Sequence, residues 1–481
     1  MNKQITQVFA LMLILFAVLV GASSWWTTFG ADGLKNNPAN RRGLLQEQRI
    51  PRGLILTDNG DAAARSQRQG SGNSLRYVRT YPTGNLFSHV VGYSFIQLGR
   101  AGLEKSENDA LAGNQNEFSS IVDELLNRPQ EGFDLHTTLD TGAQRLARQL
   151  LAGKGRGSVV VMEPKTGRVR VMLSQPDYDP NTIPQDFKQL NRDPSSPLFN
   201  RATQAGYPPG SSMKIVTASA ALDSGRYTPN SVVSGKSPKI VGGVPLSNCC
   251  TEGSGNFGAL TLTEALAKSV NTVWGEVGEK LGKNTMFDYM RRFGFDSKPP
   301  IDLPRDELRT SGVYGRGGKL LDEHDAIDIG RVAIGQERLN VTPLQMAEVA
   351  ATVANGGVRM RPQLVDRVVA RDGRVKDRRK PEQIQRVIKE STAREVTQMM
   401  EGVVDHGTAV AAKIPGVPVA GKTGTAEVDN GAANQAWFVA FAPANDPKIA
   451  IAVTVERTQG EGGTVAAPIA KQIIQYMLGK G

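Results

Sequence analysis

The chain has 481 residues, of which 39% are hydrophobic, so it has room for roughly three domains and for a substantial core. Its formal net charge of +10, from 57 basic and 47 acidic side chains, admits an anionic partner such as nucleic acid, phospholipid or an acidic wall polymer. We exclude nucleic acid, because the clearest basic stretch, residues 367–389, carries no nucleic-acid-binding motif and the N-terminus indicates export.

The N-terminal segment is predicted to form a membrane-spanning helix. Lys3 is followed by no charged residue until Asp32, and residues 8–26 are predominantly apolar. A helix of this length spans about 28 Å, close to the thickness of the hydrocarbon layer of a bilayer, and its two tryptophans suit the outer interface. A cleavable signal peptide, cut near Val20-Gly21-Ala22, is the alternative. We expect a retained single-pass anchor with the bulk of the chain outside the cell membrane.

The next region, residues 31–150, mixes short apolar runs with polar, glycine-rich segments and has no catalytic constellation. Residues 62–74 are expected to be flexible. Beyond it, two alternating apolar runs, 158–162 and 169–173, flank Lys165-Thr166-Gly167. This string is predicted to be a hairpin turn that needs its glycine, without a catalytic role.

Ser211 follows two prolines and a glycine and begins an alanine-rich apolar run that ends at Gly225. This pattern is typical of a turn that leads into a helix. Lys214 then lies one turn later on the same face, within reach of the hydroxyl, and the helix N-terminus favours a developing oxyanion. For Lys214 to act as a base, its ammonium must lose its proton near neutral pH, which burial beside another cation, here Lys422, promotes. A capping serine with a solvated lysine is the alternative.

Of several Ser-x-Asn strings, Ser269-Val270-Asn271 is the one in a strongly helical setting, residues 262–272. The others lie among glycines or charges and are typical of turns. A helix, or the tight turn at its end, can present both side chains on one side, where the Ser269 hydroxyl passes a proton and the Asn271 amide holds a substrate carbonyl. The alternative is that both satisfy backbone groups at a helix end.

The two cysteines, Cys249 and Cys250, are adjacent. Neighbouring cysteines rarely form a relaxed disulfide, and no second pair indicates metal ligation, so we predict neither a metal site nor a cofactor. Further along, the basic stretch is predicted to be a solvated hairpin that turns at Asp372-Gly373. Helices are predicted at residues 342–354, 391–404 and 468–478.

The second Lys-Thr-Gly string lies in a strand-like segment, residues 417–428, which two further strand-like runs follow, 436–442 and 448–456. We predict an antiparallel sheet whose first member borders the cleft, with Gly424 allowing a ligand backbone to approach closely. Lys422, Thr423 and Thr425 suit a substrate carboxylate. Together the three strings supply a nucleophile, a proton relay and an anion-recognising strand, a full set of parts for acyl transfer through a serine.

With these strings the chain resembles the penicillin-binding proteins, specifically the monofunctional class B peptidoglycan D,D-transpeptidases, and among them the shorter PbpA-like members. Other matching segments are scattered from about residue 50 to near the end of the chain, and their combined specificity is high. They include Arg52-Gly53-Leu54-Ile55, Asp58-Asn59-Gly60, Gly102-Leu103-Glu104, Pro197-Leu198-Phe199-Asn200-Arg201-Ala202, Ile334-Gly335-Gln336, Thr342-Pro343-Leu344-Gln345-Met346-Ala347, Gly407-Thr408-Ala409 and Trp437-Phe438-Val439.

The resemblance implies an α/β (α+β) fold, in which a serine β-lactamase-like transpeptidase domain has a central antiparallel sheet flanked by helices. It divides the chain into a cytoplasmic tip and transmembrane anchor at residues 1–30, a small N-terminal pedestal (dimerisation-like) domain at 31–150 and the penicillin-binding transpeptidase domain at 151–481. No segment for glycan polymerisation is seen, so a polymerase partner of the membrane-embedded SEDS type is implied.

The resemblance also implies a reaction and its residues. Ser211 is acylated by a peptidoglycan stem peptide ending in D-Ala-D-Ala, and the amine of a neighbouring strand then attacks the ester; β-lactam antibiotics acylate the same serine. Lys214 takes the Ser211 proton, Ser269 and Lys422 shuttle it to the leaving amine, and Asn271 holds the substrate. Thr423 and Thr425 meet its carboxylate, and the backbone amides of Ser211 and Thr425 form an oxyanion hole. A D,D-carboxypeptidase, a β-lactamase or a catalytically silent scaffold are the alternatives.

Overall fold

The computed structural model describes residues 2–26, 48–113, 131–248, 255–428 and 431–479. By their internal contacts they divide into two units. The first is Met1–Pro51 with Gln67–Val78, and the second is Arg52–Ser66 with Arg79–Gly481.

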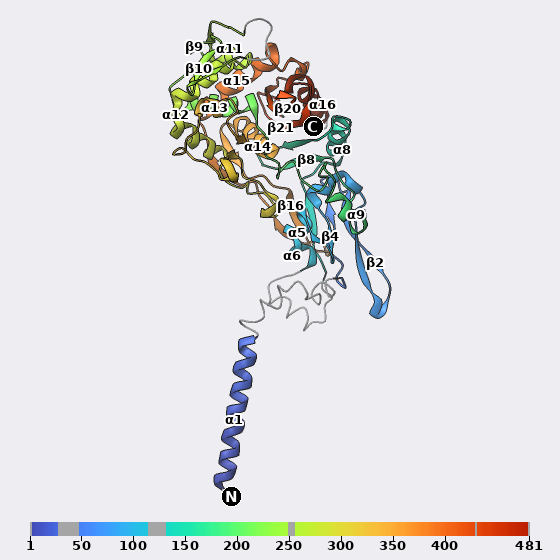
Figure 1. Ribbon diagram of the computed structural model, residues 1–481. Coiled ribbons are helices and arrows are strands. Elements are labelled where there is room, and N and C mark those ends of the chain that lie inside the picture. Colours follow the sequence, from blue (N-terminus) through green and yellow to red (C-terminus); the bar gives the residue numbers. More distant parts are fainter. Residues whose placement is uncertain (1, 27–47, 114–130, 249–254, 429–430, 480–481) are drawn as a thin grey trace. The chain divides into compact units, whose positions relative to one another are not determined.

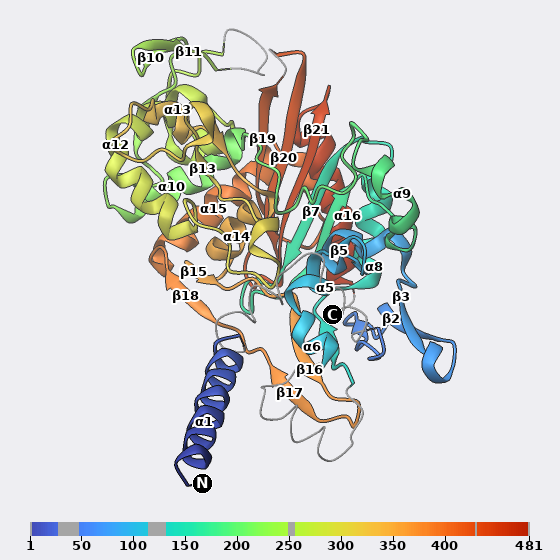
Figure 2. The same ribbon diagram turned by 60° about the horizontal axis from the view of Figure 1, so that its bottom comes forward.

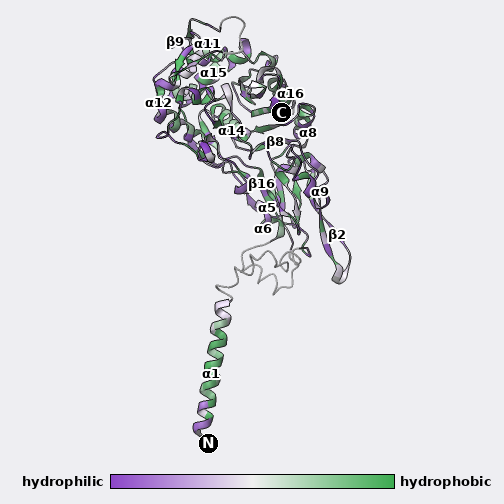
Figure 3. Ribbon diagram, viewed as in Figure 1, coloured by the Kyte–Doolittle hydropathy of each residue, from purple (hydrophilic) through white to green (hydrophobic). Residues whose placement is uncertain are grey.

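The main element of the first unit is the helix α1 (Asn2–Trp25), which is apolar along most of its length (Figure 3). Its segment Lys3–Trp25 is long and apolar enough to cross a bilayer, and no other helix in the described ranges meets that standard. None of this segment is buried against protein. Such a helix is consistent with a membrane anchor or with a signal sequence.

The second unit contains a five-stranded antiparallel sheet in the order β19-β20-β21-β7-β8. The hairpin of β7 (Gly157–Met162) and β8 (Val169–Gln175) turns at Gly167, whose φ of +76° favours glycine, as predicted for the first Lys-Thr-Gly string. The other three strands are β19 (Ala420–Val428), β20 (Ala433–Ala442) and β21 (Ile449–Thr458), and β19 forms one edge. The antiparallel sheet predicted for the three C-terminal strand-like runs is therefore confirmed.

Helices cover both faces of this sheet (Figure 2). On one side lie α10 (Lys214–Asp223), α12 (Asn271–Phe293), α14 (Pro343–Ala354) and α15 (Glu390–His406); on the other lie α8 (Thr141–Leu151) and α16 (Ala467–Leu478). The three helices predicted at the C-terminal side of the sequence are confirmed as α14, α15 and α16. The layers bury large apolar side chains of the sheet such as Trp437 and Phe438, and burial of this kind supplies most of the favourable free energy of folding.

A second sheet, in the order β17-β16-β6-β1-β2-β3, combines strands from distant parts of the sequence (Figure 1). Its N-terminal members are β1 (Ile55–Leu56), β2 (Ala62–Gln69), β3 (Arg76–Thr80) and β6 (Asp134–Thr137). The hairpin of β16 (Val365–Val369) and β17 (Val375–Arg378) completes it, and this hairpin turns at Gly373 as predicted. Its membership in this sheet was not predicted, because strand pairing across more than 200 residues leaves no local signal.

The segment 62–74, expected to be flexible, forms β2 and a 3-10 turn at Gly72–Ser74. Its polar sequence gives no strand alternation, but Ala63 and Ala64 are small enough to be buried against their neighbours. The boundary at residue 150 stays a prediction; α8, which ends at Leu151, packs mainly against β8 and α16 and also contacts the N-terminal 3-10 turn Gly84–Phe87.

The remaining elements are short. They are α4 (Ser88–Val91), β4 (Ser94–Phe95), β5 (Gly99–Arg100), α5 (Gly102–Ser106), α6 (Asn108–Ala112), α9 (Ile183–Leu190), β9 (Val232–Ser234), β10 (Lys239–Val241), β11 (Val244–Leu246), β12 (Ala259–Thr261), α11 (Leu262–Ala267), β13 (Gly312–Val313), α13 (Ile329–Ala333), β14 (Leu339–Asn340), β15 (Val358–Met360) and β18 (Gln383–Arg386).

Candidate active site

Ser211 lies in a 3-10 turn, Gly210–Met213, that leads directly into α10. Gly210 has a φ of +52°, and a Cβ atom there would lie 2.6 Å from the carbonyl oxygen of Thr425 on β19. Only glycine therefore lets the turn lie this close to the edge strand. The predicted arrangement of a turn feeding a helix, with Ser211 at its start, agrees with the structure.

Lys214, the first residue of α10, is fully buried beside Ser211. Its Nζ donates to Ser211 Oγ at 2.9 Å and to Asn271 Oδ1 at 2.7 Å. It also donates to Ser269, at 2.8 Å to the carbonyl oxygen and at 3.2 Å to Oγ. The lysine amine thus joins the two predicted serines and the predicted asparagine around one nitrogen.

Ser269 lies in the tight connection between α11 and α12 rather than within a helix. Its φ of +59° is unusual for a residue with a side chain, and its backbone N–H donates to Leu266 O at 3.1 Å. Asn271 begins α12. The sharp turn brings both side chains toward Lys214, so the second of the two settings considered for this string, a turn at a helix end, is the one observed.

Lys422 extends from the edge strand β19 to the other side of Ser269. Its Nζ donates to Ser269 Oγ at 2.9 Å and to the Thr423 carbonyl oxygen at 3.1 Å. The side chain is fully buried, and this burial lowers the pKa of the Lys422 ammonium to about 7, because a low-dielectric environment disfavours its charge. Ser269 Oγ therefore stands between two lysine nitrogens, a geometry that allows a proton to pass from one to the other.

The rest of β19 lines the same region. Thr425 Oγ1 accepts a hydrogen bond from the backbone N–H of Gly462 at 3.3 Å. A Cβ atom at Gly424 would lie 2.5 Å from the carbonyl oxygen of Pro209 and 3.2 Å from the N atom of Ser212. The turn that carries Ser211 thus lies close to Gly424, and the approach of a ligand backbone at this glycine stays a prediction.

Three features near the site were not assigned a role from the sequence. Thr408 Oγ1 lies 2.6 Å from Thr423 Oγ1; its motif was noticed only as part of the resemblance. Gly462, whose backbone N–H donates to Thr425 Oγ1, could not be recognised from the sequence, since the two residues are 37 positions apart. Glu456 accepts hydrogen bonds from Tyr207 and Arg201 and so holds the segment that precedes Ser211.

The eight predicted site residues thus lie on the Ser211 turn and the start of α10, on the α11–α12 junction and on the edge strand β19, which meet. The arrangement has a hydroxyl nucleophile beside an amine, a relay hydroxyl between two amines, and hydroxyls on an edge strand, so it can perform acyl transfer without histidine. Among the described residues no group of His, Cys, Asp and Glu is arranged to hold a metal ion, and the prediction that no cofactor is needed stays a prediction. Cys249 and Cys250 lie outside the described residues.

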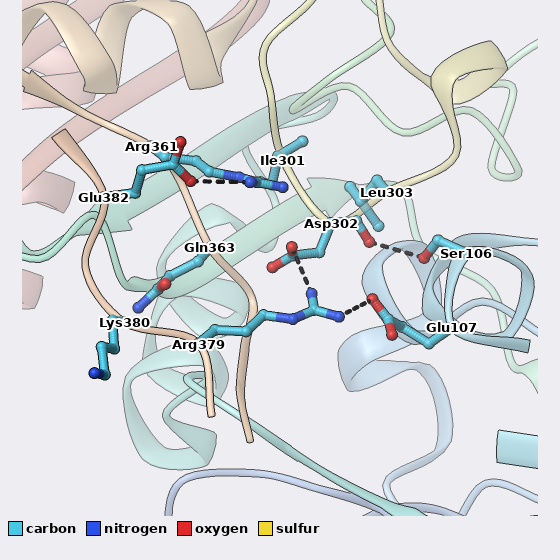
Figure 4. Close-up of a pocket in the computed structure, with 10 residues that line it drawn as sticks. All are labelled: Ser106, Glu107, Ile301, Asp302, Leu303, Arg361, Gln363, Arg379, Lys380 and Glu382. Carbon is cyan, nitrogen blue, oxygen red and sulfur yellow. Dashed lines mark hydrogen bonds and ion pairs between the residues drawn. The ribbon is translucent and has the colours of Figure 1, made fainter. Parts of the chain in front are cut away.

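A separate polar cavity of about 490 Å³ lies elsewhere in the second unit, and none of the eight site residues lines it. In Figure 4, Arg379 lies between two carboxylates in this cavity. Its guanidinium donates to Asp302 Oδ1 at 2.6 Å and to Glu107 Oε1 at 2.7 Å. These ion pairs tie the end of the β16–β17 hairpin to the α5–α6 connection and to the loop at residue 302.

Comparison with known proteins relates these features to a family. Residues 157–475 match the model of the penicillin binding protein transpeptidase domain, and residues 52–135 match the penicillin binding protein A dimerisation domain. The peptidoglycan D,D-transpeptidase PbpA of Mycolicibacterium smegmatis is 34% identical, with 100% of both chains covered. PbpA of Mycobacterium tuberculosis is 32% identical, with 99% of each covered.

Solved structures agree. A penicillin-binding protein A from M. tuberculosis, described as a ceftriaxone acyl-enzyme complex, superposes with a TM-score of 0.79 at 32% identity over 90% of this chain and 99% of that chain. The D,D-transpeptidase domain of a peptidoglycan glycosyltransferase from Eggerthella lenta superposes with a TM-score of 0.78 at 33% identity, covering 90% of this chain and 99% of that chain.

Proposed function

Because the chain belongs to the penicillin-binding proteins, as a PbpA-like class B transpeptidase, we infer that it is a peptidoglycan D,D-transpeptidase whose nucleophile is Ser211. The observation that carries this assignment is the convergence of Ser211, Lys214, Ser269, Asn271 and Lys422, joined by hydrogen bonds of 2.7 to 3.2 Å. The proposal assigns each of these groups a step.

Acylation begins when Ser211 Oγ attacks the carbonyl carbon of the penultimate D-Ala of a stem peptide ending in D-Ala-D-Ala. Lys214, in its neutral form, takes the hydroxyl proton across the 2.9 Å contact. The negative charge that forms on the carbonyl oxygen is stabilised by the backbone amides of Ser211 and Thr425, a contribution of about 3 to 4 kcal/mol in comparable sites. Asn271 holds the substrate.

The leaving group is the amine of the terminal D-Ala, which needs a proton to depart. Ser269 and Lys422 provide the route, since Ser269 Oγ contacts both lysine nitrogens. When the tetrahedral intermediate collapses, the C–N bond breaks, the acyl group stays on Ser211 and D-Ala leaves. The amine of a neighbouring stem peptide then attacks the ester, forms the cross-link and returns the proton to Ser211.

Recognition of the terminal carboxylate is assigned to Lys422, Thr423 and Thr425 on β19. A buried ammonium flanked by hydroxyls suits a carboxylate, because hydrogen bonds to a charged group are stronger than those between neutral groups. β-Lactams carry a carboxylate and a strained amide, so we expect them to acylate Ser211 by the same route. The acyl-enzyme complexes described for the M. tuberculosis protein support this expectation.

For the whole chain we propose the division predicted from the sequence: residues 1–30 form a cytoplasmic tip and anchor, 31–150 a pedestal and 151–481 the transpeptidase domain outside the cell membrane. The apolar helix α1 supports the anchor. We further propose a SEDS-type glycosyltransferase as partner, since a transpeptidase needs a source of glycan strands. Crosslinking from the anchor and pedestal in living cells tests this pairing, and recovery of no such polymerase would contradict it.

Labelled penicillin tests the activity class. A transpeptidase is expected to keep the label for many minutes, because water is a poor acceptor in its acyl-enzyme. Rapid turnover of the label would indicate a β-lactamase, and the absence of labelling would indicate a silent scaffold. A D,D-carboxypeptidase also keeps the label, so a second experiment is needed to distinguish it. Release of D-Ala from a stem-peptide donor is measured in the presence and in the absence of an amine acceptor. We expect a cross-linked product, and hydrolysis of the donor alone would contradict the proposal.

A further inference from the structure

Thr408 occupies a fixed position beside the proposed site. It follows Gly407 in the turn after α15, and its backbone N–H donates to Ala267 O at 3.2 Å, at the end of the helix that precedes Ser269. A Cβ atom at Gly407 would lie 2.3 Å from that same oxygen, and one at Gly463 would lie 2.5 Å from the Thr408 carbonyl oxygen. The two glycines, Gly407 and Gly463, therefore let the end of α11 and the segment at residue 463 lie directly against the backbone around Thr408.

The Thr408 side chain is exposed, and its hydroxyl contacts that of Thr423, which is only 6% exposed. The two Oγ1 atoms are 2.6 Å apart. On its other side, Thr423 Oγ1 lies 3.5 Å from Lys422 Nζ. The polar groups of Lys422, Thr423 and Thr408 thus contact one another in sequence. Lys422 and Thr423 belong to β19, whereas Thr408 belongs to the turn after α15.

Each hydroxyl has one proton to donate and two lone pairs to accept. In a contact between two hydroxyls, one proton is used between the oxygens, and the other is left to point outward. The Thr408–Thr423 pair consequently offers one donor beyond itself, and the direction of that donor depends on both side chains. Without the Thr408 hydroxyl, Thr423 Oγ1 loses the nearer of these two contacts, at 2.6 Å against 3.5 Å for Lys422 Nζ.

We propose that Thr408 is a positioning residue for recognition of the substrate carboxylate, acting through the Thr423 hydroxyl. This inference rests on the proposed function, in which Thr423 meets the carboxylate of the stem peptide. The carboxylate of a penicillin serves as the probe, and the methyl ester of the same penicillin, which has no anionic oxygen, serves as its neutral counterpart.

The experiment compares full-length wild-type enzyme with Thr408→Val, Thr408→Ser and a control, Thr397→Val, whose hydroxyl bonds only its own helix at Ala393 O. The second-order rate constant of acylation is measured with the acid and with the ester. We expect Thr408→Val to lower the rate for the acid about tenfold, as for loss of one hydrogen bond to a charged group, and to change the ester rate less than about twofold. Thr408→Ser is expected to restore the acid rate, and Thr397→Val to resemble wild type.

Equal losses of acylation rate for acid and ester, or no loss with either, would overturn the inference, because a merely structural role does not distinguish the two probes.

Thr423→Val separates failure of this inference from failure of the proposed function. If Thr423→Val reduces the preference for the acid and Thr408→Val does not, only the inference fails. If Thr423→Val leaves the preference intact, the assignment of Thr423 itself fails. The double variant is expected to lose no more than Thr423→Val alone, since the two hydroxyls act as one unit; additive losses would also overturn the inference.

Discussion

At the scale of single residues, the account depends most on Lys214, whose amine contacts Ser211, Ser269 and Asn271. We expect Lys214→Ala to slow acylation by penicillin by about 10²- to 10⁴-fold, the usual loss when a general base is removed. Stopped-flow or quenched labelling measures the rate, and circular dichroism with the melting temperature establishes that the variant is folded.

Lys188→Ala is the matched control, since Lys188 is exposed on α9, outside the site. It should acylate at the wild-type rate. A folded Lys214→Ala protein that acylates within a fewfold of wild type would remove Lys214 as the base.

Lys422 makes binding of the carboxylate depend on pH. Burial lowers its pKa to about 7 in the free protein, so its charge is present below that pH and is lost above it. The affinity for a penicillin acid should therefore fall as the pH rises through about 7, by at most about tenfold per pH unit because one proton is involved. The pre-acylation dissociation constant between pH 6 and 9 measures this effect.

The penicillin methyl ester provides the comparison for Lys422, because it has no carboxylate to attract the ammonium. Its dissociation constant should change little over the same range. An acid affinity that is flat, or that rises with pH, would contradict the role of Lys422 in anion recognition.

The residues of the site could be predicted because each lies in a short string with a distinct local setting. Ser211 follows two prolines and a glycine, and Lys422 follows a glycine in an apolar strand. Thr408 and Gly462 could not be assigned in this way, since their contacts with Thr423 and Thr425 span 15 and 37 residues and depend on how separate elements meet.

At the scale of elements, the site depends on the fit between the Ser211 turn and β19. In Gly210→Ala, the new Cβ atom would lie 2.6 Å from Thr425 O, and a φ of +52° would add strain of about 1 to 2 kcal/mol. We expect the variant to melt at a lower temperature and to acylate at least about tenfold more slowly, because a shift of about 1 Å at the nucleophile is costly.

Gly225→Ala separates backbone strain from this clash. Gly225 has a φ of +73°, but a Cβ atom there would meet nothing within 4 Å. This control should lose stability while keeping the wild-type acylation rate. Equal acylation rates for the two glycine variants would show that the close contact with β19 does not matter for the reaction.

Periodicity and turn chemistry were sufficient to predict α14, α15, α16, the β7–β8 hairpin and the antiparallel sheet of β19, β20 and β21, because these features are local. Pairing partners were harder to predict. The β16–β17 hairpin was recognised from its turn, but its place beside β6 depends on register with a strand more than 200 residues earlier. The strand β2 was missed because its exposed positions are polar and its buried positions are alanines.

At the scale of the whole molecule, α1 decides where the enzyme works. If the helix is retained, a tag placed before Met1 should remain on the mature protein, and the protein should stay in the membrane fraction after an alkaline carbonate wash. Blotting for the tag, together with the intact mass, measures this. A mature chain that begins after residue 22, without the tag, would show that the segment is a signal peptide.

The family and the general fold class could be predicted for the whole chain, since motifs scattered from residue 52 to residue 439 agree with one architecture. The domain boundaries are harder to place. The boundary at residue 150 stays a prediction, and the sheet in which β16 and β17 join β6 and β1 combines strands from both sides of it. No local feature of the sequence marks a strand that belongs to a distant sheet.

The proposed mechanism requires that penicillin, and by extension the stem peptide, acylates Ser211. Mass spectrometry of the tryptic peptide of residues 202–214, after treatment of the full-length protein with penicillin, tests it most directly, since this peptide contains both Ser211 and Ser212. Ser212 is buried, and its hydroxyl donates to Pro209 O at 2.7 Å. We predict that the added mass lies on Ser211, persists in Ser212→Ala and is absent in Ser211→Ala; an adduct on any other residue, or one that survives in Ser211→Ala, would contradict the account.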